Sequence, residues 1–253
     1  MTKDELTTAK AEDRIAQCRD GWYVTSTGFL DSHEQALVRK VTMHAAGVRT
    51  LMYGGYDDAE RRMLVCIPAD LPLSDEEAEE GLVCVLRVSR PPLSRRLSHR
   101  DYLGSILGLG IERRLVGDIL VREDGADIII LPEIADFLKR EYHQAGHTEI
   151  KTETVSAGDL IIPEAKCRII KDTVSSVRLD SVVSSAFGIS RSNAAKAIRS
   201  GLVSVDHEEC LKADAKPEEG AVIVLKGKGK AVLEEIGDAS RKNRIWVRIK
   251  LYY

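Results

Sequence analysis

The sequence predicts a mixed α and β protein built from three small domains. Three observations support this prediction. The chain has 253 residues, apolar residues follow helical spacing in some segments and strand spacing in others, and Gly and Pro separate these segments. The length is large for one domain. A content of 43% hydrophobic and 30% charged residues is that of a globular protein and excludes a disordered or collagen-like chain.

The first domain is predicted over residues 1–81 as a small α/β unit. Apolar spacing indicates two helices and then two strands: Asp4–Arg19, Ser32–Ala46, Val48–Tyr53 and Arg62–Ile67. An acidic stretch follows, and Ser74 is expected to cap a short helix there, since a serine oxygen accepts a backbone hydrogen bond in the first turn.

The second domain, residues 82–156, is predicted to have the order β-α-β-β-α-β. The expected strands are Leu82–Val88, Asp118–Val121, Asp127–Leu131 and Glu149–Val155, and the expected helices start at Ser98 and at Pro132, the latter running to Ala145. This order is the ferredoxin-like pattern, which RNA-recognition motifs share. The strand at Asp127–Leu131 lacks the exposed aromatic residues that stack bases, so no base stacking is assigned to this sheet.

Residues 157–177 are predicted to be a connector with some strand content, followed by a third domain over residues 178–253. Apolar residues mark one side of a helix from Arg178 to Phe187. A second short helix is expected to begin after Ser190 as its N-cap and to end before Gly201. Strands are expected at Leu202–Asp206, Ala221–Leu225 and Ile245–Tyr253.

Positive charge gathers in this third domain. Residues 175–253 carry 14 Lys and Arg against 10 Asp and Glu, whereas residues 1–90 carry 11 against 16. In the second short helix, Ser192, Lys196 and Arg199 are spaced so that they share one exposed face. The nearby helix N-terminus also favours phosphate. The pattern indicates a face for a polyanion.

Several motifs resemble a known family. The segment RLDSVVSSAFGISRSNAAKAIRSG, followed by LVSVD, resembles the S-four RNA-binding domain, although Asp206-His207 stands where that domain usually has Asn-Gly. With FLDSHEQ, YGGYDDAERR and LSHRDYLGSILGLGIERRLVGDI, the chain resembles the YlmH-like family of bacterial S-four proteins over nearly its whole length. The resemblance implies an N-terminal α/β domain, a central domain like an RNA-recognition motif, and binding to a large ribosomal subunit obstructed by peptidyl-tRNA, in quality control of stalled translation.

Within the S-four resemblance, the candidate RNA-binding residues surround the two short helices and the later turn: Arg178, Ser190, Arg191, Ser192, Lys196, Arg199, Lys226, Lys228 and Lys230. An ordinary solvated surface explains the three lysines of the turn equally well. Arg191 lies off the Lys196 stripe, where pairing with an acid is the alternative.

The last strand also alternates strictly. Trp246, Arg248, Lys250 and Tyr252 face one way, opposite an aliphatic face. A basic and aromatic face suits phosphates and bases. An edge strand protected by its charges is the interpretation we favour.

Four residues of the central domain are secondary candidates for RNA contact: His99, Arg100, Arg113 and Arg114. The first two lie at an expected helix N-terminus, and the other two follow a Gly-rich turn. That turn is not a dinucleotide-binding fingerprint, because Arg113 stands where the third glycine belongs.

The segment Ser98-His99-Arg100-Asp101 has the His-Arg-Asp order of a kinase catalytic loop. Ile106 stands where such a loop has Asn, so the kinase interpretation fails. A capping box between Ser98 and Asp101 is expected instead. No motif places a nucleophile.

Five cysteines and six histidines are scattered, without a CxxC pair, so no metal and no other cofactor is expected. The longest uncharged runs have ten residues, about half of what a membrane-spanning helix needs, and the N-terminus lacks the apolar core of a signal peptide. We expect a cytoplasmic monomer without membrane partners.

The sequence therefore predicts a non-enzymatic protein that binds ribosomal RNA, with transfer RNA as a further candidate. One alternative is an RNA-modifying enzyme, such as a pseudouridine synthase or an rRNA methyltransferase, that uses the S-four module as a clamp. Such an enzyme needs a catalytic Asp motif or a methyl-donor site, and neither is found. The other alternative is a protein-binding adaptor, which RNA binding with and without residues 175–253 would distinguish.

Overall fold

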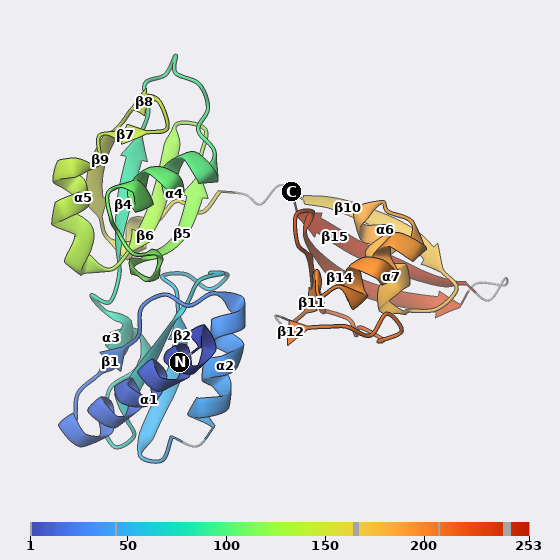
Figure 1. The fold of residues 1–253 in the computed structure, drawn as a ribbon, viewed down its shortest axis with the longest axis horizontal. Helices are drawn as coiled ribbons and strands as arrows, with labels where there is room; N and C mark the ends of the chain where they lie inside the picture. Colours follow the sequence, from blue (N-terminus) through green and yellow to red (C-terminus); the bar gives the residue numbers. More distant parts are fainter. Residues whose placement is uncertain (1, 44, 164–166, 207, 240–243, 253) are drawn as a thin grey trace. The chain divides into compact units, whose positions relative to one another are not determined.

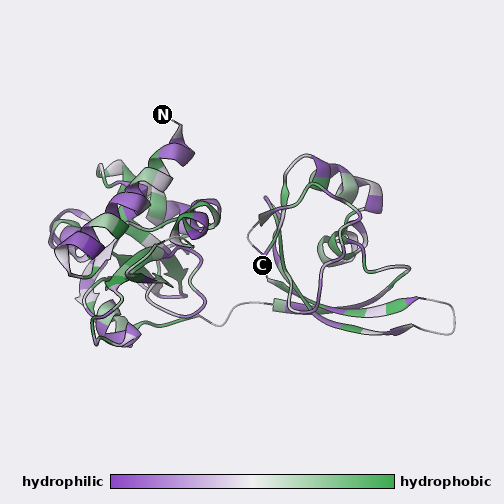
Figure 2. Cartoon of the chain, turned by 90° about the horizontal axis from the view of Figure 1, so that it is seen from below, coloured by the Kyte–Doolittle hydropathy of each residue, from purple (hydrophilic) through white to green (hydrophobic). Residues whose placement is uncertain are grey.

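In a computed structural model, the chain divides into two units, residues 1–163 and 164–253 (Figure 1). The structure describes residues 2–43, 45–163, 167–206, 208–239 and 244–252. Many helices show alternating hydrophilic and hydrophobic segments, as amphipathic helices do (Figure 2).

The N-terminal part of the first unit contains three helices and a three-stranded sheet of order β1-β3-β2. Its elements are α1 (Lys3–Gly21), β1 (Thr25–Ser26), α2 (Ser32–Thr42), β2 (Val48–Tyr53), β3 (Met63–Pro68) and α3 (Asp75–Glu79). Ser74 caps α3, as expected. Helix α2 ends four residues before the predicted Ala46. The Thr42 hydroxyl donates to the Arg39 carbonyl at 2.9 Å, a local bond that competes with continuing the helix.

The central part has the predicted β-α-β-β-α-β order. Its main elements are β4 (Cys84–Ser89), α4 (His99–Gly108), β5 (Val116–Val121), β6 (Gly125–Ile130), α5 (Ala135–Glu141) and β9 (Lys151–Val155). They are joined by the 3-10 turns η1 (Arg113–Leu115), η2 (Pro132–Ile134) and η3 (Ala157–Asp159). The antiparallel sheet order β5-β6-β4-β9 is that of the ferredoxin-like fold, which confirms the predicted topology.

The helix predicted from Pro132 to Ala145 is shorter than expected. It ends at Glu141, and the chain then forms a small hairpin of β7 (Gln144–Ala145) and β8 (Thr148–Glu149). Tyr142, only 1% exposed, is inserted into the core, and its hydroxyl donates to the Tyr102 carbonyl at 3.2 Å. Burial of this ring turns the chain away from the helix axis.

The N-terminal and central parts share a hydrophobic core. Phe29 and Met63 from the first part pack with Val83 and Ile129 from the second. The predicted division near residue 81 therefore lies inside one compact unit, because both sheets bury apolar side chains at the same place.

The second unit packs two helices on one face of a six-stranded sheet of order β10-β15-β14-β13-β11-β12. Its elements are β10 (Cys167–Val174), α6 (Leu179–Phe187), α7 (Arg191–Arg199), β11 (Val203–Val205), β12 (Glu208–Glu209), β13 (Val222–Leu225), β14 (Gly229–Ala239) and β15 (Ile245–Tyr252).

Two expectations for this unit need correction. The strand content predicted for the connector, residues 157–177, is present as the eight-residue strand β10, but β10 pairs with β15 along its whole length and so belongs to the C-terminal domain, which was predicted to begin at residue 178. Consequently β15 lies between β10 and β14, and the edge-strand interpretation of the last strand was wrong. Strand β10 precedes α6 and α7 in the chain, so the local pattern of the last strand could not predict that β10 pairs with it.

Candidate nucleic-acid interface

The core of the interface is the helical pair α6 and α7. Leu179, Val182, Val183 and Ala186 of α6 are fully buried against the sheet. Gly188 ends α6 in the left-handed conformation at φ 62, which a residue with a Cβ adopts only with strain. Ser190 then caps α7 by accepting a hydrogen bond from the Asn193 N–H at 3.2 Å.

Helix α7 presents the predicted basic stripe. Ala194 and Ile198 point into the core, which leaves Ser192, Lys196 and Arg199 exposed on the opposite side. Among the residues that the structure describes, no acid lies within ion-pair distance of Lys196 or Arg199. Both charges are therefore available to a polyanion.

Arg178 and Arg191, by contrast, are both paired with an acid. Arg178 Nη2 and Arg191 Nη2 each lie 3.1 Å from a carboxylate oxygen of Asp180, which is 5% exposed. Desolvation acts to raise the pKa of Asp180, but the hydrogen bonds from both guanidinium groups outweigh it and hold the pKa below its usual value. The predicted alternative for Arg191, pairing with an acid, is what the structure shows.

The predicted lysine turn is divided between two surfaces. Lys226 and Lys228 are exposed in the β13–β14 turn, and the Lys226 N–H donates to the Leu202 carbonyl at 2.9 Å, just after α7 ends. This bond brings the turn beside the C-terminal end of the α7 stripe. Lys230 lies instead in β14, with its Nζ 5.1 Å from the centre of the Tyr252 ring.

Lys230 belongs to the sheet face opposite the helices. There Lys230 and Lys250 flank the Tyr252 ring, and Lys171 of β10 is the register partner of Arg248. Arg248 Nε lies 3.0 Å from Glu234 Oε2, which offsets one positive charge. This outer face is formed by three strands, β10, β15 and β14. The pattern of the last strand alone therefore did not predict how wide the face is or that Lys171 belongs to it.

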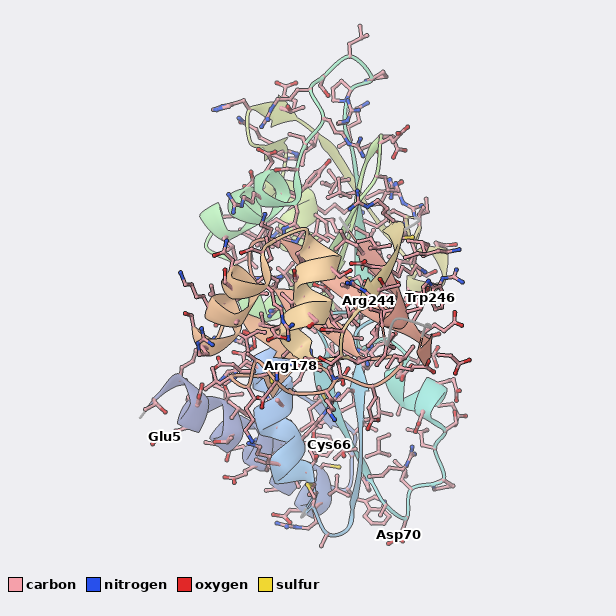
Figure 3. All side chains as sticks on the ribbon, turned by 90° about the vertical axis from the view of Figure 1, so that its right-hand side faces the viewer. Glu5, Cys66, Asp70, Arg178, Arg244 and Trp246 are labelled. Carbon is pink, nitrogen blue, oxygen red and sulfur yellow. The ribbon has the colours of Figure 1, made fainter. Side chains whose placement is uncertain are left out.

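A small polar pocket of about 190 Å³ lies between α6, α7 and β10. Its walls include Ser181, Ser184, Ser185, Arg191 and Arg244. Arg244 Nε donates to the Thr173 hydroxyl at 2.9 Å. Arg178, Arg244 and Trp246 are labelled in Figure 3. Arg244 was not among the predicted site residues, because only the pairing of β15 with β10 brings it to this place.

The secondary candidates in the central domain differ in availability. His99 and Arg100 are exposed at the start of α4. Arg113 donates to the Val116 and Gly117 carbonyls, and burial lowers the pKa of its guanidinium to about 10. Arg114 Nε lies 2.8 Å from Glu112 Oε2. Arg113 therefore supports the backbone, and Arg114 is partly neutralised.

The predicted capping box at α4 is confirmed. The Asp101 N–H donates to the Ser98 hydroxyl at 3.4 Å, and the Ser98 N–H donates to the Asp101 carboxylate at 2.7 Å. These hydrogen bonds explain the Ser98-His99-Arg100-Asp101 segment as a helix start.

Within the described residues, no group of three or more His, Cys, Asp or Glu side chains is placed to hold a metal ion. The absence of a cofactor remains a prediction. No helix in the described part of the chain is both long and apolar enough to cross a membrane.

Two family models match this chain in separate segments. The family model described as "Putative RNA-binding domain in YlmH" matches residues 78–167, and the S4 domain model matches residues 177–223. The chain is also similar to "Ribosome-associated protein quality control protein P2" of Bacillus subtilis (strain 168). The two are 31% identical over 218 residues, which span 86% of this chain and 83% of that protein.

A solved structure, "Cell division protein ylmH from Streptococcus pneumoniae", matches with a TM-score of 0.51 and 22% identity. The match covers 64% of this chain and 96% of that chain. At this level of identity the match shows a shared fold.

Proposed function

Because this chain belongs to the YlmH-like family of S-four RNA-binding proteins, we propose that it binds ribosomal RNA on the large subunit and acts in quality control of stalled translation. The name of the Bacillus subtilis relative, a ribosome-associated quality control protein, supports the ribosomal assignment. Transfer RNA on an obstructed subunit is a further partner within this proposal. Such a protein acts in the cytoplasm, and we propose that it does so as a monomer.

One observation carries the proposal: the α7 stripe is charged, exposed and unpaired. Lys196 and Arg199 have no ion-pair partner among the described residues, and Lys226 and Lys228 lie in a turn beside the end of the same helix. Four cations along one edge match the closely spaced phosphates of an RNA backbone. Ser192 adds a hydroxyl donor next to the helix N-terminus.

Such contacts recognise shape more than sequence. Phosphate contacts set the position and orientation of a protein, whereas base edges carry the sequence information. Folded ribosomal RNA offers phosphates in fixed arrangements at junctions and bends. The ion pairs of Asp180 with Arg178 and Arg191 hold α6 and α7 together. Such a rigid pair of helices suits this target, because its charges are in place before RNA binds.

The proposal is of a binding protein without catalytic activity. No observation on the described residues favours the RNA-modifying alternative, and Ser190, Arg178 and Arg191 are held by a helix cap and by ion pairs to Asp180. The adaptor alternative is tested by the same experiment as the main proposal.

The test is the double variant Lys196→Glu with Arg199→Glu, measured for binding to purified large ribosomal subunits. We expect a loss of affinity of at least tenfold, since two phosphate contacts become repulsive. The matched control is Arg39→Glu with Lys40→Glu, which reverses two exposed charges in the last turn of α2, as the test variant does in α7. Equal affinities of the two variants, with unchanged circular dichroism melts, would refute the α7 interface.

A further inference from the structure

The middle of the central sheet is covered on both faces. On β6, Ile128 points to the helices, while Ile129 packs with Phe29 and Met63 of the N-terminal part. A Cβ at Gly117 on the neighbouring strand would lie 2.8 Å from the Phe29 ring, so the two parts meet in close contact. RNA-recognition motifs bind RNA on their exposed sheet face, and here the N-terminal part covers it.

The remainder of this face is closed by the chain that follows β9. Asp127 is 0% exposed, and its carboxylate lies 2.8 Å from Arg87 Nη2. It also accepts a hydrogen bond from the Ile161 N–H at 2.9 Å. On this face the edge strand β9 keeps Lys151 and Glu153 exposed while the centre is covered, so the sheet offers RNA no broad surface.

The strongest candidate outside the sheet is the loop between β4 and α4, which extends beyond the β7–β8 hairpin (Figure 1). From Ser89 at the end of β4 to Arg100 in the first turn of α4, this segment carries four arginines and no acid. Arg95, Arg96 and Arg100 are exposed. At its tip, Leu93 is 102% exposed, as a free side chain would be.

The loop is held in a defined shape. Arg90 Nε donates to the Glu123 carbonyl at 3.1 Å, and Arg90 Nη1 donates to the Ser94 carbonyl at 2.7 Å. Leu97 anchors the far end in the core at 2% exposure. Arg95 is bound to Asp101 at 2.6 Å. These contacts fix the conformation of the loop. Among the described residues, neither Arg96 nor Arg100 has an ion-pair partner.

A pocket of about 430 Å³ lies at the base of the loop. Its apolar walls are Pro91, Pro92 and Ile150, and its polar lining is Ser89, Arg90, Glu149 and Lys151. Apolar walls beside cations suit an unpaired nucleotide, whose base stacks while its phosphate is neutralised.

We propose that this loop is a second RNA-binding element, in which Arg96 and Arg100 contact phosphates and the pocket at its base takes an unpaired base. The inference rests on the proposed function, because it takes the same ribosomal RNA as its target. It assigns the RNA contact of the central domain to a loop, in place of the covered sheet.

The test compares four forms of the full-length protein on large ribosomal subunits and on protein-free ribosomal RNA. They are the wild type, Arg96→Glu with Arg100→Glu, the α7 variant Lys196→Glu with Arg199→Glu, and the control Lys139→Glu with Arg140→Glu. The control reverses two exposed cations on α5 of the same domain. We expect the loop variant to bind both targets roughly tenfold more weakly than the control, with a salt slope flatter by about 1.5.

The outcomes separate the two proposals. If the loop variant binds like the control while the α7 variant is weakened, the loop inference fails and the proposed function stands. If only the loop variant is weakened, the loop inference stands and the α7 interface fails. If the loop variant loses subunit binding but binds protein-free RNA like the wild type, the loop contacts a ribosomal protein and the inference is overturned. If the wild type binds neither target, both proposals fail.

Discussion

Arg191 Nη2 lies 3.1 Å from Asp180 Oδ1, so a residue in the first turn of α7 is bound to a buried carboxylate in the first turn of α6. Arg178 binds the same carboxylate from the preceding chain. The three side chains fix the two helices to one another. Asp180 is therefore a positioning residue for the α7 stripe, although it is an acid inside a basic surface.

Replacing Asp180 by Asn is expected to destabilise the C-terminal unit by about 1–3 kcal/mol at pH 7, because two hydrogen bonds to a charged acceptor are lost. The pKa of Asp180 is depressed in the folded state, so its contribution is present above about pH 4 and disappears as the pH falls below that. The difference between wild type and variant should shrink towards pH 3.

This difference is measured by urea denaturation in a Trp22→Phe background, where Trp246 is the single tryptophan and reports the C-terminal unit. Asp238→Asn, at an exposed position of β14, is the matched control. A destabilisation that stays the same at pH 7 and pH 3 would show that the carboxylate charge is not responsible.

Binding to large ribosomal subunits is expected to depend strongly on salt. The C-terminal unit offers Lys196, Arg199, Lys226 and Lys228, because Asp180 partly neutralises Arg178 and Arg191. At 0.7–0.9 per phosphate, four contacts contribute roughly −3 to the slope of log K against log salt. A fragment of residues 1–163 should lose this part of the slope, and it ends before β10 because β10 belongs to the C-terminal sheet. Full slope and affinity in the fragment would contradict the proposed interface.

Tyr56→Phe is expected to destabilise the first unit by about 1.5–3 kcal/mol, the worth of a hydrogen bond to a charged group. The Tyr56 hydroxyl donates to Asp118 at 2.9 Å, and the Arg61 N–H donates to the same carboxylate at 3.0 Å, which joins the N-terminal and central parts. Trp22 fluorescence in a Trp246→Phe background follows the unfolding. Tyr23→Phe, at a residue that is 54% exposed, should be neutral. A similar loss of stability in that variant would show that the hydrogen bond from Tyr56 to Asp118 is not the cause.

Thiol labelling should distinguish three classes of cysteine. Cys167 is exposed, Cys84 and Cys210 are partly covered, and Cys18 and Cys66 are buried. Burial raises the pKa of Cys66 to about 12, which keeps its thiol protonated and unreactive near neutral pH. Iodoacetamide followed by peptide mass spectrometry should find Cys167 modified first, and Cys66 only in denaturant. Early labelling of Cys66 would show that the first unit opens readily.

Local sequence patterns were sufficient for most elements and for the centre of the candidate site. The caps at Ser74, Ser98 and Ser190 were predicted because a cap depends on residues three apart. The exposed placement of Lys196 and Arg199 followed from helical periodicity for the same reason. The ferredoxin-like order was readable because each element is bounded by its own turn signals.

What the sequence by itself determined was thus most of the elements, the order of the central domain and the basic stripe on α7, all of which depend on residues close together in the chain. Only the tertiary structure decided that β10 covers the edge of β15, that Asp180 engages Arg178 and Arg191, and that the central sheet is covered by the N-terminal part. The strand pairing and the covered sheet join segments far apart in the chain, and the Asp180 contacts depend on how α6 and α7 are placed against one another. Strand pairing and burial depend on which surfaces meet in space, and a local pattern carries no record of the partner.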